Sequence, residues 1–195
     1  LGDVVGYGGD PAGCVSLIRE RCSAVIMGNH DAAVAGAVST EYFNSAARAA
    51  VSWTRQALNL EDIGWLEALP YEMVFDDYCI VHATPDNPHR WSYLMSDDHA
   101  EELFGFFSGP LLFYGHTHYP LAFEQSLGQM LEYRLHESTL GTEVVMDERQ
   151  AHTSAVGNRA HRHPAVAVLA QDGRRRAEQL LARFASPGQA LVFCR

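Results

Sequence analysis

The stretch PLLFYGHTH, residues 110–118, joins an apolar run to two histidines that stand one residue apart. Residues 111–114 are short, apolar throughout and followed by glycine, a pattern typical of a strand buried on both faces of a sheet. If residues 115–118 continue the extended backbone, its alternation turns His116 and His118 to the same side. The pair is therefore either a pair of metal ligands at the end of a buried strand or part of a polar turn. Motifs elsewhere in the chain distinguish these alternatives.

Helical and strand patterns alternate along the whole chain. A capping aspartate, a proline at the first helical position and apolar residues on one face predict a helix over residues 10–22. Further helices are predicted over residues 44–58, 60–69, 96–107 and 174–184. Strands are predicted over residues 23–27, 72–75, 78–81, 111–114, 122–123, 131–135, 143–146, 165–169 and 190–193. This alternation predicts an α/β fold with buried strands, in which ligands gather at the carboxyl ends of strands.

Four short polar motifs stand where such strand ends are expected: GD at residues 2–3, GNHD at 28–31, VH at 81–82 and GHTH at 115–118. GNHD is expected to form a polar loop. Imidazole nitrogens, a carboxylate and an amide oxygen form a mixed ligand set that suits manganese, iron or zinc better than magnesium or calcium. A polar turn does not explain the common placement of the four motifs, so the sequence favours a metal site.

In this order, the four motifs resemble those of the calcineurin-like metallophosphoesterases, and the resemblance extends over residues 1–169. The flanking stretches GDVVGYGGDP, FNSAARAAVSWTRQAL and SAVGNRAHRHP resemble the bacterial branch of that superfamily often labelled phosphodiesterase or diadenosine-tetraphosphatase-like. The resemblance implies a four-layer α/β/β/α sandwich of mixed sheets. It also implies two divalent metal ions, with manganese favoured over iron or zinc.

The resemblance assigns metal ligands at the matching positions. It implies that Asp3 bridges the two ions, that Asn29, His82 and His116 complete one metal site, and that His118 serves the other. A hydroxide bridging two metal ions is a nucleophile at neutral pH, and two ions screen both the attacking and the leaving oxygen.

The resemblance also assigns two catalytic residues. It implies that His30 protonates the leaving group or steadies the transition state, and that Asp31 orients His30 by hydrogen bonding. The activity expected from this set is hydrolysis of phosphodiester bonds or of small phosphate esters, including nucleotides.

Two departures from the family pattern bear on this expectation. The family's first motif, an Asp-x-His on the first strand, has no counterpart, and the chain opens on Leu1 without a methionine. We therefore expect that residues 1–195 are a single metallophosphoesterase domain that lacks its first strand and first metal motif. In addition, residues 152–161 replace the family's usual glycine-rich turn. The alternative is a non-catalytic metallophosphoesterase-like binding or scaffold protein with a defective first metal site.

The composition limits the classes of partner. With 24 acidic and 14 basic residues the net charge is −10, and apart from Arg174-Arg175-Arg176 there is no basic stripe for a nucleic-acid backbone. No apolar run approaches the roughly 20 residues of a membrane helix. The four cysteines are scattered without a CxxC pair, which favours reduced thiols. We therefore expect a cytoplasmic protein that binds a small phosphate ester or nucleotide, with no membrane partner and with its oligomeric state left open.

Overall fold

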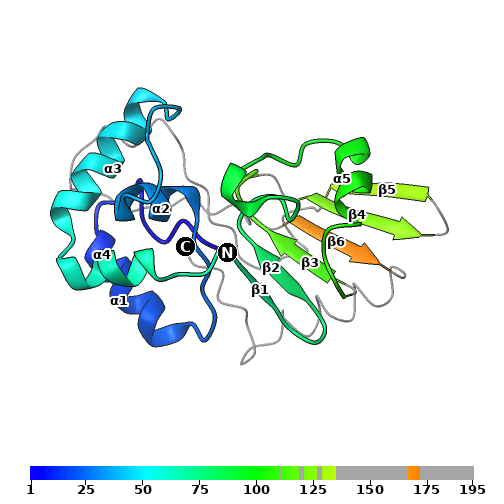
Figure 1. Ribbon diagram of the computed structural model, residues 1–195, viewed down its shortest axis with the longest axis horizontal. Coiled ribbons are helices and arrows are strands. Elements are labelled where there is room, and N and C mark those ends of the chain that lie inside the picture. The colour runs from blue at the N-terminus through cyan, green and yellow to red at the C-terminus, as the bar shows by residue number, and fades with distance from the viewer. Residues whose placement is uncertain (110, 119–120, 127–128, 135–166, 172–195) are drawn as a thin grey trace.

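The computed structural model describes residues 1–109, 111–118, 121–126, 129–134 and 167–171. The described helices and strands fall into two halves, which are seen side by side in Figure 1. Helices α1 to α4 form a helical half on the left of that view, and six strands with helix α5 form a sheet half on the right. The N-terminal end of the chain lies between the two halves.

The helices of the first half begin at capping residues. They span Pro11–Arg21 (α1), Asn29–Ala35 (α2), Ser45–Ala57 (α3) and Leu60–Glu67 (α4). The side chains of Asp10, Asn44 and Asn59 accept the main-chain N–H of the third following residue at 2.9, 2.8 and 2.8 Å. These N-caps satisfy N–H groups that the first turn leaves without partners. The helices predicted over residues 10–22, 44–58 and 60–69 are therefore confirmed.

An apolar core between the helices holds the N-terminal loop in place. Val4 and Val5 from that loop are buried with Val15 of α1, Val51 of α3 and Leu66 of α4. Because apolar burial stabilises the folded state by about 25 cal/mol per Å², this core ties the residues that directly follow Asp3 to the helices.

The second half is a mixed sheet of six strands. Its strands are Glu72–Val74 (β1), Cys79–Val81 (β2), Leu111–Tyr114 (β3), Leu121–Ser126 (β4), Gln129–Arg134 (β5) and Ala167–Gln171 (β6). The strand order is β1-β2-β3-β6-β4-β5. The pairs β2–β3 and β4–β6 are parallel, and the other three pairs are antiparallel.

The central strands are buried on both faces. Val81, Leu112 and Tyr114 pack in a cluster with residues of α5, whereas Ile80 and Phe113 pack in a different cluster with Ile26. Successive side chains of a strand point to opposite faces, so these two clusters lie on the two sides of the sheet. This explains why residues 111–114 are apolar without alternation.

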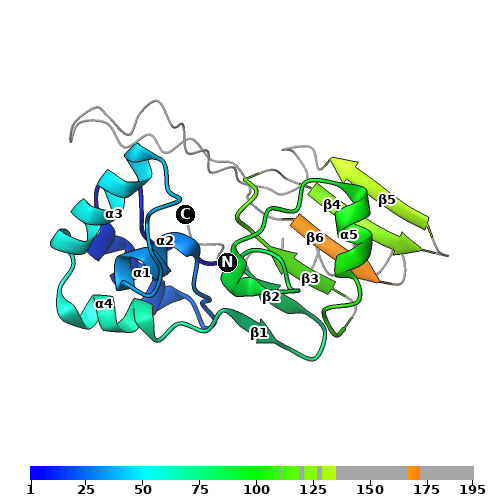
Figure 2. The same cartoon turned by 45° about the horizontal axis from the view of Figure 1, so that its top comes forward.

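The chain between β2 and β3 crosses one face of the sheet. It contains a single 3-10 turn, Pro88–Arg90 (η1), and helix α5 (Asp97–Leu103), which Ser96 caps by accepting the His99 N–H at 3.4 Å. Figures 1 and 2 both show α5 lying alongside β4 and β5. The helix is shorter than the predicted 96–107 because a turn that includes Gly105 follows it.

The predicted α/β fold with a mixed sheet is confirmed, while the described residues contain one sheet, so the four-layer arrangement stays a prediction. The strand predicted over residues 23–27 is wrong for the described part of the chain. Ile26 and Met27 are buried and apolar, as a strand requires, but the segment pairs with no described strand. Instead, the Met27 N–H donates to the Pro70 carbonyl at 2.7 Å. The elements predicted over residues 143–146, 174–184 and 190–193 lie outside the described residues.

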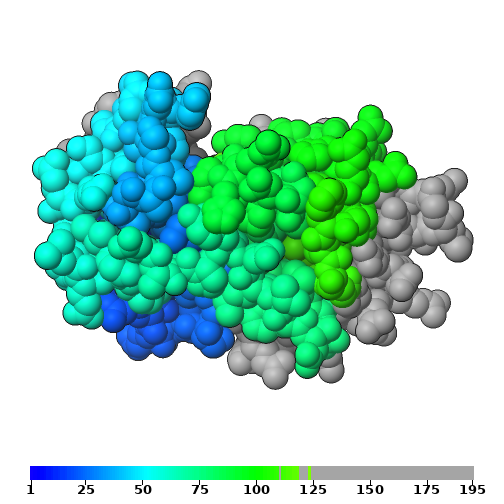
Figure 3. All heavy atoms as spheres, viewed as in Figure 1, coloured from blue at the N-terminus to red at the C-terminus, as the bar shows by residue number. Residues whose placement is uncertain are grey.

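The space-filling view in Figure 3 shows the two halves meeting across the middle of the molecule. A notch is visible at the top of that view, between the blue and cyan residues of the helical half and the green residues of the sheet half. Within the described residues, no helix has both the length and the apolar character that crossing a membrane demands.

Candidate metal centre

Two of the predicted motifs meet because β2 and β3 are parallel neighbours. Val81 pairs with Tyr114 in the strand register, so His82 and Gly115 directly follow the paired strand ends. The Gly115 N–H donates to the His82 carbonyl at 2.9 Å and extends the contact by one residue. The carboxyl ends of the two strands therefore bring the VH and GHTH motifs together, as the sequence pattern predicts.

The GNHD motif begins a helix instead of forming the predicted loop. Asn29 is the first residue of α2 and Gly28 is its N-cap. The Asp31 carboxylate accepts the Gly28 N–H at 3.0 Å, which is one half of a capping box, and it accepts the Val5 N–H at 3.1 Å. Asp31 is fully buried, and it joins the start of α2 to the N-terminal loop.

Asp3 reaches the centre where two chain segments cross. Its backbone is left-handed, with a φ of 52°, and its carboxylate accepts the His30 N–H at 3.0 Å. A Cβ atom added at Gly28 would lie only 2.1 Å from Asp3 Oδ1 and 2.2 Å from the Asp3 nitrogen. The crossing therefore requires glycine at position 28.

Each histidine at the strand ends has one ring nitrogen on a main-chain carbonyl. His82 Nδ1 lies 2.6 Å from the Leu1 oxygen, and His116 Nε2 lies 2.9 Å from the Trp91 oxygen. A carbonyl only accepts hydrogen bonds, so each of these nitrogens must carry the proton. In a neutral ring the other nitrogen then has a free lone pair. This is the arrangement in which histidine binds a metal ion, with the second nitrogen donating to a carbonyl.

Acceptor atoms converge around His82 Nε2. It lies 3.4 Å from Asp3 Oδ2 and 3.2 Å from Asn29 Oδ1. One ligand atom from each of Asp3, His82 and His116 lies within 4.8 Å of the other two. The facing atoms of Asp3, Asn29 and His82 are all acceptors when His82 Nε2 is unprotonated, and they then repel one another. A positive charge between them, either a proton or a metal ion, removes this repulsion. The residues fit a divalent ion held by nitrogen and oxygen ligands.

The two histidines of GHTH do not lie on an extended strand. His116 and His118 both have left-handed backbones, with φ values of 63° and 57°, so the alternation expected for residues 115–118 is wrong. His116 is buried, whereas His118 is exposed and is not a member of the three-residue ligand group. His118 still lies close enough for its charge to act on His30 and His116.

His30 is buried beside this group, but its ring is held differently. Its Nδ1 atom is buried without a hydrogen-bond partner. Both oxygens of the Asp31 carboxylate accept main-chain N–H groups, and the His30 Nδ1 atom makes no hydrogen bond to them. The rings of Tyr7 and Phe43 lie near the His30 ring instead, with centroid distances of 4.7 and 5.1 Å.

Burial and neighbouring charges set opposite pKa shifts on the two carboxylates. Burial raises the pKa of Asp3, but the charge and hydrogen bond of His82, together with His30, outweigh it and hold that pKa well below its ordinary value. For Asp31, burial and the Asp3 charge raise the pKa to about 7, against the opposing effect of its main-chain N–H bonds. Asp3 is therefore the carboxylate that stays ionised.

The histidines also differ in their pKa values. Burial and then the His82 charge lower the pKa of His116 to about 4. Burial lowers the pKa of His30 more than the Asp3 charge raises it. For His82 burial is opposed by the charge and hydrogen bond of Asp3, and the net effect is a raised pKa. His82 is thus the ring on which a positive charge is favoured, whether from a proton or from a metal ion.

Sequence reasoning missed the two carbonyls that orient the ligand rings, those of Leu1 and Trp91. Trp91 has a left-handed backbone with a φ of 56°, which is uncommon for a bulky residue. This conformation presents the Trp91 oxygen to His116. A main-chain carbonyl leaves no signal in the residue type, so no sequence pattern could have identified either group.

The chain is similar in sequence to a curated protein. No protein-family model matches the chain. The chain is 35% identical over 146 residues to uncharacterized protein MJ0912 of Methanocaldococcus jannaschii, which covers 72% of this chain and 56% of that protein. The chain thus spans little more than half the length of this curated relative.

Solved structures give a second comparison. The chain resembles the crystal structure of a metallophosphoesterase from Sphaerobacter thermophilus, with a TM-score of 0.60 and 32% identity over 89% of this chain and 63% of that one. Its likeness to hypothetical protein PH1004 from Pyrococcus horikoshii OT3 is weaker, with a TM-score of 0.47 and 18% identity over 62% of this chain and 56% of that one, and supports no conclusion. With the motifs GD, GNHD, VH and GHTH in order and a metallophosphoesterase as structural neighbour, the chain is similar to the calcineurin-like metallophosphoesterases in motif order and in fold.

Proposed function

We propose that the chain hydrolyses phosphodiester bonds or small phosphate esters in a reaction that depends on bound divalent metal ions. The observation that carries this proposal is the convergence of Asp3, Asn29 and His82 on one point, with His116 beside them. Unless His82 is protonated, these four potential ligands face one another without a proton donor, which is a costly arrangement for a merely structural site. A metal ion at that point removes the cost.

In this proposal Asp3, Asn29, His82 and His116 would hold one ion, and His118 with the Asp3 carboxylate would serve a second. Manganese, iron and zinc all suit these ligands, and we favour manganese. When bound, such ions polarise a phosphoryl oxygen and generate a nucleophile from water at neutral pH. The substrate is a small phosphate ester or a nucleotide, and the proposed setting is the cytoplasm.

The chain's own residues supply the remaining roles. As the oxygen of water bonds to phosphorus, the bond from phosphorus to the leaving oxygen breaks and negative charge develops on that oxygen. We assign to His30 the stabilisation of this charge by a hydrogen bond from its ring N–H, and the proton that the attacking water loses balances the one that the leaving oxygen gains. Asp31 supports His30 indirectly, because it fixes the start of α2 and the N-terminal loop.

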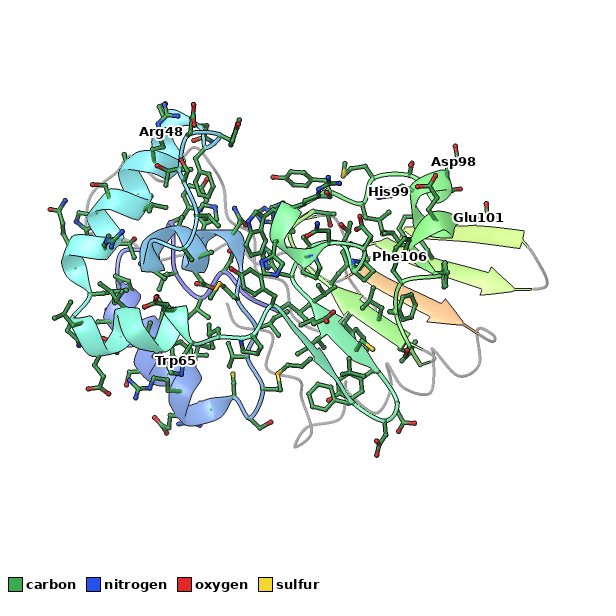
Figure 4. All side chains as sticks on the ribbon, in the orientation of Figure 1. Arg48, Trp65, Asp98, His99, Glu101 and Phe106 are labelled. Carbon is green, nitrogen blue, oxygen red and sulfur yellow. The ribbon has the colours of Figure 1, made fainter. Side chains whose placement is uncertain are left out.

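The test is a hydrolysis assay on protein purified without chelator and loaded with Mn²⁺. With bis(p-nitrophenyl) phosphate and p-nitrophenyl phosphate as substrates, Asn29→Ala and His82→Ala should each lower kcat/KM by at least about 100-fold. The matched control is His99→Ala, which removes a histidine of α5 that Figure 4 places in the sheet half, away from α1 to α4. Hydrolysis that is unchanged in both ligand variants would sink the proposal.

A second candidate is a metal-binding protein that does not catalyse hydrolysis. It is favoured by the position of His118, which is exposed and lies outside the one ligand group found among the described residues. Elemental analysis of the Mn²⁺-loaded chain separates the two candidates. Two ions per chain with hydrolysis support the phosphoesterase, whereas a single ion without hydrolysis supports the second candidate.

A further inference from the structure

Among the buried histidines of the described residues, His30 differs from His82 and His116 in the way its ring is held. The rings of His82 and His116 are fixed by hydrogen bonds to main-chain carbonyls. The Nδ1 atom of His30 has no such partner, although it is buried. Because no hydrogen bond through that atom selects its orientation, the ring must be positioned by the groups that pack against it.

Three residues from two loops make this packing. A Cβ atom added at Gly6 would lie 2.7 Å from His30 Nδ1, so the main chain at residue 6 passes directly against the ring. Tyr7 follows with a tilted ring contact of 4.7 Å, and Phe43 adds a second tilted contact of 5.1 Å. Offset and tilted aromatic contacts of this kind contribute about 0.5–1.5 kcal/mol each.

Phe43 belongs to the loop between α2 and α3, and Arg48 holds that loop from outside the site. The Arg48 guanidinium donates to the Phe43 carbonyl and, at 3.5 Å, to the Glu41 carbonyl. Arg48 itself is exposed on α3, and Figure 4 shows it at the outer part of the helical half. It therefore acts on the loop without touching the metal centre.

We propose that Phe43 and Arg48 are positioning residues for His30. Arg48 fixes the main chain of residues 41–43, and this keeps the Phe43 ring against the His30 imidazole. The inference rests on the proposed function only where it concerns catalysis. The contact chain from Arg48 through Phe43 to His30 is a statement about structure and can be tested separately.

The structural test uses proton NMR of the histidine rings in the full chain. The His30 ring signal is assigned with His30→Gln, and Phe43→Leu then shows how it moves when the aromatic ring is removed. We expect Arg48→Ala to move the same signal in the same direction. Arg21→Ala, which removes an exposed arginine paired with Glu20 within α1, is the matched control and should leave the signal in place. An Arg48→Ala spectrum identical to wild type at His30 would overturn the proposal, even if the chain hydrolyses nothing.

The catalytic test compares leaving groups in the Mn²⁺-loaded protein. If His30 stabilises the leaving oxygen, its correct position matters most for esters with poor leaving groups. We expect Phe43→Leu to lower kcat about tenfold for an alkyl phosphate ester, with KM unchanged and little effect on the p-nitrophenyl ester. Arg48→Ala should give a smaller loss of the same kind, and Arg48→Lys should restore part of it. Equal losses for both esters, or none for either, would contradict a positioning role while leaving the hydrolytic function itself established by the wild type.

Discussion

The two halves of the molecule supply the metal centre by different means. The sheet half delivers His82 and His116 from the ends of β2 and β3, and main-chain carbonyls fix both rings. The helical half delivers Asp3 and Asn29 through a close crossing of two segments at Gly28. The register of β2 and β3 is set by main-chain pairing over three residue pairs, whereas the crossing depends on the absence of one side-chain atom. The helical half should therefore respond more sharply to small changes.

The largest effect is expected from Gly28→Ala. The new methyl group would lie about 2 Å from Asp3, so the crossing must open. We expect the free energy of unfolding to fall by about 3 kcal/mol and Mn²⁺ binding to be lost, as measured by denaturant unfolding and titration calorimetry. The control is Gly64→Ala in α4, where a Cβ meets nothing within 4 Å and the helix should gain stability. If Gly28→Ala and Gly64→Ala had the same stability and the same Mn²⁺ binding, the crossing at Gly28 would not be the sensitive point of the helical half.

In the sheet half, His82→Ala and His116→Ala should damage binding more than folding. Each removes one ligand atom but leaves the pairing of β2 and β3 untouched. We expect the affinity for Mn²⁺ to fall by at least about 100-fold in each variant, while the far-ultraviolet circular dichroism stays that of the wild type. Full affinity in either variant would show that this strand end contributes no ligand.

Asp31→Ala should damage folding more than Mn²⁺ binding. The substitution leaves the buried N–H groups of Gly28 and Val5 without acceptors. We expect the free energy of unfolding to fall by about 2 kcal/mol, with a smaller loss of Mn²⁺ affinity than in His82→Ala. Denaturant unfolding and calorimetry on the same preparations measure both quantities. A large loss of affinity without loss of stability would make Asp31 part of the ligand set.

The smallest effect is expected at the cap of α5. Ser96→Ala removes the oxygen that accepts the His99 N–H. The free energy of unfolding should fall by about 1 kcal/mol and the Mn²⁺ affinity should stay unchanged, because α5 packs on one face of the sheet and supplies no residue to the ligand group. A change of Mn²⁺ affinity in Ser96→Ala would mean that a disturbance at α5 reaches the metal centre through the sheet.

The sheet half of the centre could largely be predicted from sequence. The apolar runs at residues 78–81 and 111–114 indicate buried strands, and the rule that ligands gather at the carboxyl ends of strands brings His82 and His116 together. The orientation of the two GHTH histidines could not be predicted. A left-handed backbone at His116 and His118 replaces the expected alternation, and it depends on contacts that the strand pattern does not contain.

The helical half was less predictable. The sequence pattern predicts a loop at residues 28–31, although glycine is an accepted N-cap residue and an acidic residue is favourable in the first turn of a helix. The role of Asp31 was expected at the His30 ring, whereas its carboxylate bonds to main-chain amides. Long-range contacts of this kind, such as Val5 with Asp31, depend on how two distant segments cross and leave no local pattern.

The most direct test of the metal centre is anomalous X-ray diffraction from crystals of this chain grown with Mn²⁺. We predict an anomalous peak among Asp3 Oδ2, Asn29 Oδ1, His82 Nε2 and the ring of His116, within bonding distance of these ligands. A map with no peak at that position, or with manganese bound only elsewhere on the molecule, would contradict the central claim that the four residues form a metal centre.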